Sequence, residues 1–241
     1  MKKYLIVLLS IALAACSSNS KVGKTQASDT ILTIPDSLYP SADLSIPTHN
    51  EWTSKNYPKM IKSFKANPLQ LHDIVFAGNS ITSQGRNWGE RLNNKAIKNR
   101  GIAGDVTDGL IARLGEINYI KPTAVFIEIG INDLLNDTLS PERTAKNIIQ
   151  ITKIIHQQNP KTKIFVQTIF PTNKVNQAAR IKLTNDIIRK HKRKGVFTLI
   201  ETHILFAGKD DLMQKELSTD GIHLNEKGYQ IWVDCLKKYF E

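Results

Sequence analysis

Five residues of this chain, Ser80, Gly104, Asn132, Asp220 and His223, have types and neighbours that suit chemistry. Ser80 directly follows the stretch IVFAGN, where a tight strand-to-helix turn would present its hydroxyl beside free helix amides. A serine hydroxyl needs a base to take its proton, and an imidazole can both accept that proton and return it. Asp220 precedes His223 by three residues, so we expect both side chains to project the same way from one helical turn. The carboxylate would then fix the imidazole tautomer, as in serine hydrolases with a catalytic triad.

Gly104 and Asn132 would complete such a site by stabilising negative charge. Attack on a carbonyl creates an oxyanion, which needs hydrogen-bond donors about 2.7–3.1 Å away. A glycine at position 104 lets the backbone approach closely, and Asn132 carries a neutral amide that does not titrate. We therefore expect the oxyanion hole to consist of the backbone amides of Ser80 and Gly104 with the side chain of Asn132. Each residue alone also fits a turn or a helix cap, so the hypothesis depends on their joint placement.

A regular series of apolar runs predicts the elements that position these residues. The runs lie at 74–77, 96–99, 124–129, 163–168 and 197–201, and the segments between them are long enough for parallel crossovers. Strands that are apolar on both sides are typical of sheets covered by helices on both faces. The pattern predicts an α/β domain with a three-layer, doubly wound, flavodoxin-like sheet of five parallel strands. Ligands of such sheets bind beyond the carboxyl ends of the strands, where these residues fall.

Helix signals agree with this arrangement. Ser140-Pro141-Glu142 combines an N-cap, a proline at the first helical position and an acid in the first turn. Asn225 is suited to cap a last helix with an apolar and aromatic face. Between residues 35 and 68, prolines and aromatics predict an irregular segment across the domain surface, with one short helix around 59–65.

The stretches GNS, NRGIAGDVTDGL, IGINDL and DGIHLNEKGY resemble, in order, the conserved blocks of the SGNH (GDSL-type) hydrolases. Within that family they look like the esterase branch that includes platelet-activating-factor acetylhydrolase-like and sialate O-acetylesterase-like proteins. The resemblance runs from about Asp73 to Phe240. It implies that Ser80 is the nucleophile and that Gly104 and Asn132 are oxyanion donors. It also implies that His223 is the general base and Asp220 its carboxylate partner. The chain departs from the family's name-giving tripeptide by carrying Asn79 in place of aspartate, and we expect activity to survive this change.

The N-terminus is expected to target the protein rather than to fold. Two lysines and a short apolar run lead to LAAC, which resembles the lipobox of bacterial lipoproteins and ends at Cys16. We interpret 1–15 as a lipoprotein signal peptide, Cys16 as the lipidated residue, 16–34 as a flexible polar tether and 35–241 as the hydrolase domain. An ordinary signal peptide with a chance cysteine is the alternative. The lipoprotein interpretation places the protein in the bacterial cell envelope, anchored to the membrane by lipid.

Net charge and histidine spacing limit the binding partners and cofactors that we expect for this protein. The formal net charge of +11 could suit nucleic acid, but export argues against that partner and favours an anionic surface or acidic glycan. The other histidines, His49, His72, His156, His191 and His203, have no metal-binding spacing, and for His203 no acid closer than Glu201 stands out. We therefore predict no metal and no cofactor.

Together these observations predict a serine esterase that acts through an acyl-serine intermediate. On the resemblance alone, the substrate is expected to be a small acylated molecule, namely a carbohydrate O-acetyl ester. One alternative is a lysophospholipase-like lipid esterase, which would need an apolar groove near Trp88, Leu134 and Leu135. Another is a carbohydrate-binding protein that has lost activity. A nucleotide-binding flavodoxin-type protein would share the architecture but would leave Asp220 and His223 unexplained.

Overall fold

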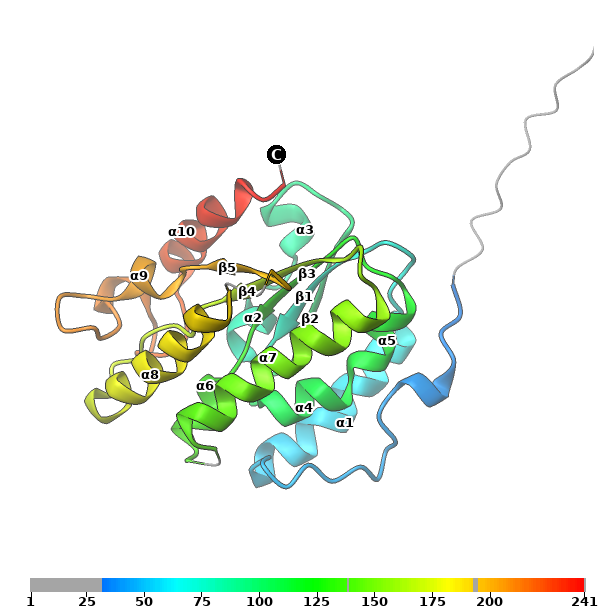
Figure 1. Cartoon of the computed structure of the whole chain (residues 1–241), viewed down its shortest axis with the longest axis horizontal. Helices are drawn as coiled ribbons and strands as arrows, with labels where there is room; N and C mark the ends of the chain where they lie inside the picture. Colours follow the sequence, from blue (N-terminus) through cyan, green and yellow to red (C-terminus); the bar gives the residue numbers. More distant parts are fainter. Residues whose placement is uncertain (1–31, 138, 193–194, 241) are drawn as a thin grey trace, which may run out of the picture. The chain divides into compact units, whose positions relative to one another are not determined.

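Five parallel strands form the centre of the protein, in the order β2-β1-β3-β4-β5 (Figure 1). This computed structural model describes residues 32–137, 139–192 and 195–240. The expected signal peptide, Cys16 and the tether up to residue 31 lie outside the described residues. The fold class predicted from the sequence is confirmed. The strands are β1 (Ile74–Gly78), β2 (Ile97–Gly101), β3 (Ala124–Glu128), β4 (Lys163–Gln167) and β5 (Thr198–Ile200).

Helices cover both faces of the sheet, as two-sided apolar strands require. In Figure 1, α3 and α10 lie on one side of the strands, and α4, α5, α7 and α8 lie on the other. The helices are α1 (Glu51–Ala66), α2 (Ser80–Gln84), α3 (Trp88–Arg91), α4 (Thr107–Ala112), α5 (Leu114–Tyr119), α6 (Ile131–Leu135), α7 (Pro141–Gln158), α8 (Val175–Lys192), α9 (His203–Phe206) and α10 (Glu226–Lys237), with short 3-10 turns at Asp36–Leu38 and Lys215–Leu217.

Both helix starts expected from capping residues are present. Ser140 precedes α7, and its hydroxyl accepts a hydrogen bond from the backbone N–H of Arg143. Asn225 precedes α10, and its side chain accepts from the N–H of Gly228. These caps satisfy amides that the first helical turn leaves free, so each start is set by local chemistry.

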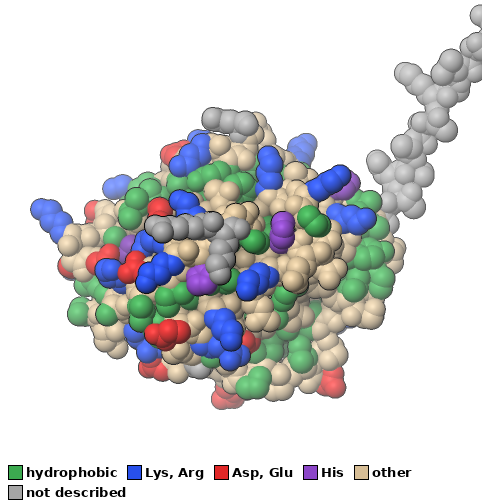
Figure 2. Space-filling model, viewed as in Figure 1, with side chains coloured by type: hydrophobic (Ala, Val, Ile, Leu, Met, Phe, Trp, Pro, Cys, Tyr) green, Lys and Arg blue, Asp and Glu red, His purple; other side chains and the backbone are tan. Residues whose placement is uncertain are grey.

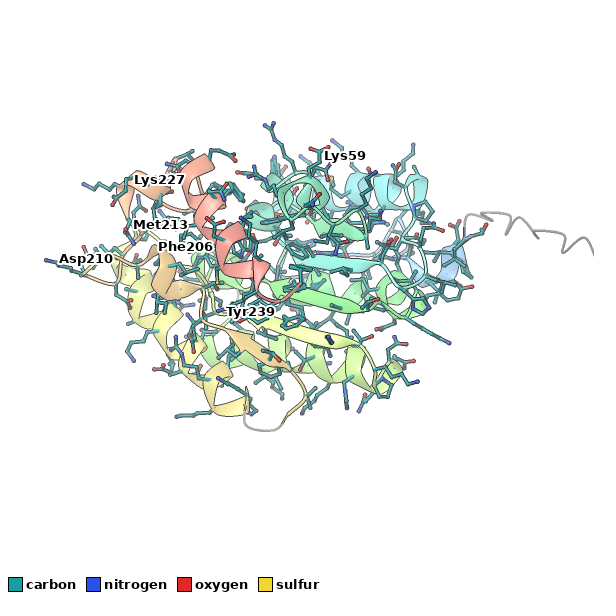
Figure 3. All side chains as sticks on the ribbon, turned by 90° about the horizontal axis from the view of Figure 1, so that it is seen from above. Lys59, Phe206, Asp210, Met213, Lys227 and Tyr239 are labelled. Atoms are coloured by element: carbon teal, nitrogen blue, oxygen red, sulfur yellow. The ribbon has the colours of Figure 1, made fainter. Side chains whose placement is uncertain are left out.

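Aromatic rings fill the layer between the sheet and α10. Phe76 and Phe126 stand side by side on β1 and β3, with ring centroids 4.8 Å apart. The ring of Tyr239 meets Phe126 and Phe165 edge-on, and Figure 3 labels it at the end of α10. Among the described residues, no helix combines the length and apolar character that crossing a membrane requires.

The segment before β1 is more ordered than its sequence predicts. The expected helix at 59–65 is the second half of α1, which begins at Glu51 because the Asn50 side chain caps the N–H of Thr53. Pro58 lies inside this helix and does not end it. Apolar and aromatic side chains of the segment, including Ile34, are buried in the common core, so it does not merely cross the surface: Ile34, Tyr39, Ile46, Tyr57, Ile61 and Phe64.

Charged side chains are scattered over the surface. Figure 2 shows Lys and Arg side chains spread across the visible face, with acidic side chains among them. The densest basic run of the sequence begins in the last turn of α8, where cations interact favourably with the helix dipole. There Arg189 is held by Glu201 and Asp186, at 2.9 and 2.8 Å.

Candidate active site

Ser80 is the first residue of α2, immediately after the carboxyl end of the central strand β1. Asn79 caps this helix, because its Oδ1 accepts the N–H of Ile81 at 2.8 Å. Gly78 makes the turn possible, since a Cβ there would collide with the backbone oxygen of Glu128 and the hydroxyl of Thr82. The strand therefore ends in a glycine so that the chain can turn sharply and present the serine. Ser80 is 8% exposed, which leaves it within reach of a small ligand.

His223 links Ser80 to Asp220. Its Nε2 lies 2.9 Å from Ser80 Oγ, and its Nδ1 lies 2.7 Å from Asp220 Oδ2. Ser80 and His223 are 143 positions apart in the sequence, so the fold brings them together. The expectation that Asp220 and His223 share a helical turn is wrong: both lie in a loop between Lys215–Leu217 and α10.

The loop holds the pair by backbone hydrogen bonds instead. Asp220 Oδ1 accepts the N–H groups of Ile222 and His223, at 2.9 and 2.8 Å. Gly221 has φ +85°, a left-handed conformation that favours glycine. Partial burial opposes ionisation of Asp220, but hydrogen bonds from the His223 side chain and from the two amides outweigh it and lower the pKa of this carboxyl. The aspartate is therefore charged at neutral pH and already oriented toward the imidazole.

The expected oxyanion donors come from the two strands that flank β1. Gly104 lies in the loop after β2, with φ +81°, and Asn132 lies in the first turn of α6 after β3. The two segments are tied together, because Asn132 Nδ2 donates to the carbonyl of Asp105 at 2.9 Å. One hydrogen of this amide is thus used to orient the side chain, and the amide carries a second hydrogen that this bond does not use.

Two other aspartates near the site have separate roles. Asp105 is fully buried and accepts from Arg113 Nε at 2.9 Å, while Arg113 also donates to the carbonyl of Gly78 at 3.0 Å. Asp133 accepts from the amide and the hydroxyl of Thr107. Burial raises the pKa of Asp133 to about 7, although the bonds from Thr107 act in the opposite direction. Neither carboxyl is bonded to His223, in agreement with the choice of Asp220 as its partner.

Two histidines that the sequence left without partners have carboxylate partners in the structure. His203 Nε2 lies 2.8 Å from Asp211 Oδ1, so the expectation that only Glu201 could serve it is wrong. Asp211 lies in the loop after α9, next to Asp210, which Figure 3 shows at the outer end of that loop. His49 Nε2 lies 3.1 Å from Asp105 Oδ1. Neither pair could be found from spacing, because loop geometry brings His203 to Asp211, and the docking of a distant segment brings His49 to Asp105.

Glu128 is a buried residue near the site that sequence reasoning missed. It ends β3 opposite Gly78, two positions before the glycine that leads into Asn132. Its carboxyl lies fully buried near the Thr82 hydroxyl, without a well-formed hydrogen bond among the described residues. Burial raises the pKa of Glu128 to about 8, which keeps the group largely neutral at pH 7. A glutamate in an otherwise apolar strand is the only signal of it in the sequence.

Two further features bear on ligands. Trp88 and Leu134, expected to line an apolar groove, are at most 1% exposed and belong to the core. Within 32–137, 139–192 and 195–240, no group of three or more His, Cys, Asp and Glu side chains is arranged to hold a metal ion.

Comparison with known proteins agrees with this fold. The model of the GDSL-like lipase/acylhydrolase family matches residues 71–231. Among solved structures, a GDSL-like lipase from Bacteroides thetaiotaomicron is 20% identical, with a TM-score of 0.68 over 76% of this chain and 96% of that one. A putative platelet activating factor structure from Streptococcus pneumonia is 24% identical, with a TM-score of 0.65 over 79% and 95%.

An acetyl xylan esterase is also similar in structure. It is 20% identical, with a TM-score of 0.60 over 70% of this chain and 100% of that one. At these identities the structural likeness shows a common fold. No curated protein matches the chain in sequence.

Proposed function

Because this chain belongs to the GDSL-like lipase/acylhydrolase family, we propose that it is a serine esterase with Ser80 as its nucleophile. The observation that carries the proposal is the continuous line of hydrogen bonds from Asp220 through His223 to Ser80, at 2.7 and 2.9 Å. These distances suit proton transfer, and the second nitrogen of the imidazole is held by a charged carboxylate.

In the proposed reaction, Ser80 Oγ attacks the ester carbonyl carbon while its proton moves to His223 Nε2. The carbonyl oxygen becomes an oxyanion, which the amides of Ser80 and Gly104 and the Asn132 side chain stabilise. The carbon–oxygen bond to the alcohol then breaks, and the alcohol leaves with the proton from His223. Water attacks the acyl-serine by the same route and releases the carboxylic acid. Asp220 stabilises the imidazolium that forms in each half of the reaction.

The proposed substrates are small acyl esters of carbohydrates, acetyl esters above all. Support comes from the sequence resemblance and from the acetyl xylan esterase among the proteins of similar structure. A lipid ester with a long acyl chain is less well supported, because two of the side chains expected to line an apolar groove, Trp88 and Leu134, are packed inside the core.

The proposed location is the bacterial cell envelope, with the domain tethered through a lipid on Cys16. The lipobox-like LAAC stretch supports it. Replacing Cys16 with alanine should move the protein out of the membrane fraction of the producing cells, and retention in that fraction would contradict the anchor.

Hydrolysis of p-nitrophenyl acetate by purified wild-type and Ser80→Ala proteins tests the activity. We expect at least about a 10⁴-fold lower kcat for the variant. A fluorophosphonate probe should label Ser80 in the wild type alone, as mass spectrometry of the labelled peptide can show. Equal rates would refute the role of Ser80, and binding of acetylated sugars without labelling or turnover would favour a non-catalytic binding protein.

A further inference from the structure

The segment that precedes the family-matched region reaches the candidate active site. The family match begins at residue 71, whereas α1 begins at Glu51. Residues 48–57 nevertheless contact the loop that carries Gly104. Thr53 Oγ1 donates to the carbonyl of Gly104 at 3.3 Å, and Asn56 Nδ2 donates to the carbonyl of Ala103 at 3.2 Å.

Further bonds hold the same segment in place. Tyr57 donates from its hydroxyl to the carbonyl of Gly109 at 2.8 Å, and Thr48 donates to Asp108 Oδ2 at 3.1 Å. Together with the His49–Asp105 contact, these bonds connect the start of α1 to residues 103–109 along their length. The first turn of α1 is therefore fixed relative to the expected oxyanion loop.

Trp52 stands in this first turn and is largely exposed. Its side chain belongs to a residue with 58% exposure, whereas the other two tryptophans of the chain, Trp88 and Trp232, are at most 1% exposed. The edge of the indole lies 3.1 Å from the position that a Cβ on Gly104 would occupy. No aromatic ring or cation stacks on it among the described residues. An open aromatic face is thus held beside the glycine whose amide we assign to the oxyanion hole.

We propose that Trp52 is a specificity-determining residue that stacks against the sugar ring of the substrate's alcohol part. This inference depends on the proposed function, because it assigns a role within the same ester-binding site. The face of an indole carries negative charge density, which attracts the polarised C–H bonds on the apolar face of a pyranose. An acetyl methyl group is too small to cover this surface, so the large exposed face suits the alcohol part of the ester.

The test compares substrates that share the acetyl group and differ in the alcohol. Wild type, Trp52→Ala and Trp52→Phe are assayed on xylose tetraacetate and on ethyl acetate by pH-stat. For Trp52→Ala we expect the ratio of kcat/KM on the sugar ester to kcat/KM on ethyl acetate to fall about 3–10-fold, mainly through KM. Phenylalanine should restore part of the ratio because it keeps an aromatic face. Tyr119→Ala, which removes an exposed aromatic side chain at the end of α5, should leave the ratio unchanged.

Other outcomes of this assay would contradict the proposed stacking of the sugar ring on Trp52. Equal losses on both esters would make Trp52 a support for the Gly104 loop only. An unchanged ratio, or no wild-type turnover of the sugar ester, would also overturn the proposal. A loss that grows from ethyl acetate to ethyl octanoate would place the acyl chain on Trp52 instead. Failure of the esterase assignment is separate, since it would appear as ethyl acetate hydrolysis that does not depend on Ser80.

Discussion

Two histidine–carboxylate pairs of this protein have nearly the same nitrogen–oxygen distance and very different surroundings. The nitrogen–oxygen distances are 2.7 Å for His223–Asp220 and 2.8 Å for His203–Asp211. The second nitrogen of His223 reaches a serine hydroxyl, whereas that of His203 reaches the carbonyl of Ile169 at 2.8 Å. The His223 side chain is 26% exposed and that of His203 is 7% exposed.

A carboxylate beside an imidazole does not by itself make that imidazole a base for catalysis. The imidazole must also reach a group that can give up a proton, at a place that substrate can enter. His203 instead connects the end of β4 to the loop after α9, which is a structural role. Matched substitutions in the two pairs can separate these roles.

The largest difference is expected between the two histidines. His223→Ala should lower kcat on p-nitrophenyl acetate by at least about 10⁴-fold, because no base remains beside Ser80. His203→Ala should keep kcat per folded molecule and lower the free energy of unfolding by about 1–3 kcal/mol, through loss of its buried hydrogen bonds. Active-site titration and chemical denaturation measure these quantities. A comparable loss of kcat in both variants would contradict the distinction.

Substitutions of Asp220 and Asp211 should also differ in their effect on kcat, but less than the substitutions of the two histidines. Asp220→Asn should lower kcat by roughly 10³–10⁴-fold, because an amide neither favours the required tautomer nor stabilises the imidazolium. Asp211→Asn should leave kcat within a few fold of wild type. Steady-state kinetics on one ester can check both, and near-normal activity of Asp220→Asn would show that the imidazole is oriented by other groups.

A smaller loss is expected at the oxyanion hole. Asn132→Ala should lower kcat by about 10²–10³-fold, the effect of removing one donor to the oxyanion. Asn136→Ala is a suitable control, because Asn136 follows the same helix and is exposed. Hydrolysis rates of the Asn132→Ala and Asn136→Ala proteins on p-nitrophenyl acetate measure this loss. If the two variants are equally active, Asn132 serves only to tie α6 to the Asp105 loop.

The last comparison concerns stability and not activity, at Glu128, a buried carboxyl near the site that has no histidine partner. The pKa of Glu128 is about 8 in the folded protein, against an ordinary value near 4.5 when unfolded. The folded state holds this proton more tightly, so the group's contribution to stability is complete below pH 4.5 and is lost as pH rises to about 8. The slope over that range is up to about 1.4 kcal/mol per pH unit.

Glu128→Gln should remove this pH dependence, because the amide resembles the neutral acid and does not ionise. Its Tm should therefore exceed that of wild type more at pH 8 than at pH 5. Glu90→Gln, which changes an exposed glutamate, should follow the wild-type profile. Parallel profiles for Glu128→Gln and wild type, measured by differential scanning calorimetry from pH 5 to 8, would rule out a buried neutral acid.

Much of the fold could be predicted from sequence because its signals are local. The apolar runs of β1 and β3 and the caps at Ser140 and Asn225 depend on neighbouring residues only, and the structure contains them. The site was predictable because parallel strands bring their carboxyl ends to one edge of the sheet. The sequence therefore made Ser80 and His223 candidates for one site, and the structure places their side chains 2.9 Å apart, although the assumed helical turn at Asp220 is a loop.

The remaining features depend on contacts between distant segments. The sequence predicted a helix only around 59–65, but burial of Tyr57 and the Asn50 cap support a longer α1. The partner of His49 is 56 positions away, and no periodic pattern marks it. Residues before 71 carry no family motif, so their approach to Gly104 was visible only in three dimensions.

The contacts between residues 48–57 and the Gly104 loop also limit how far the N-terminus of this protein can be truncated. A fragment that starts at residue 71, where family similarity begins, would lose Thr53, Asn56 and Tyr57 along with the rest of α1. The carbonyls of residues 103, 104 and 109 would then lose their donors. A fragment limited to the residues that match the family model would therefore lack side chains that hold the Gly104 loop, and the start of α1 belongs with the domain.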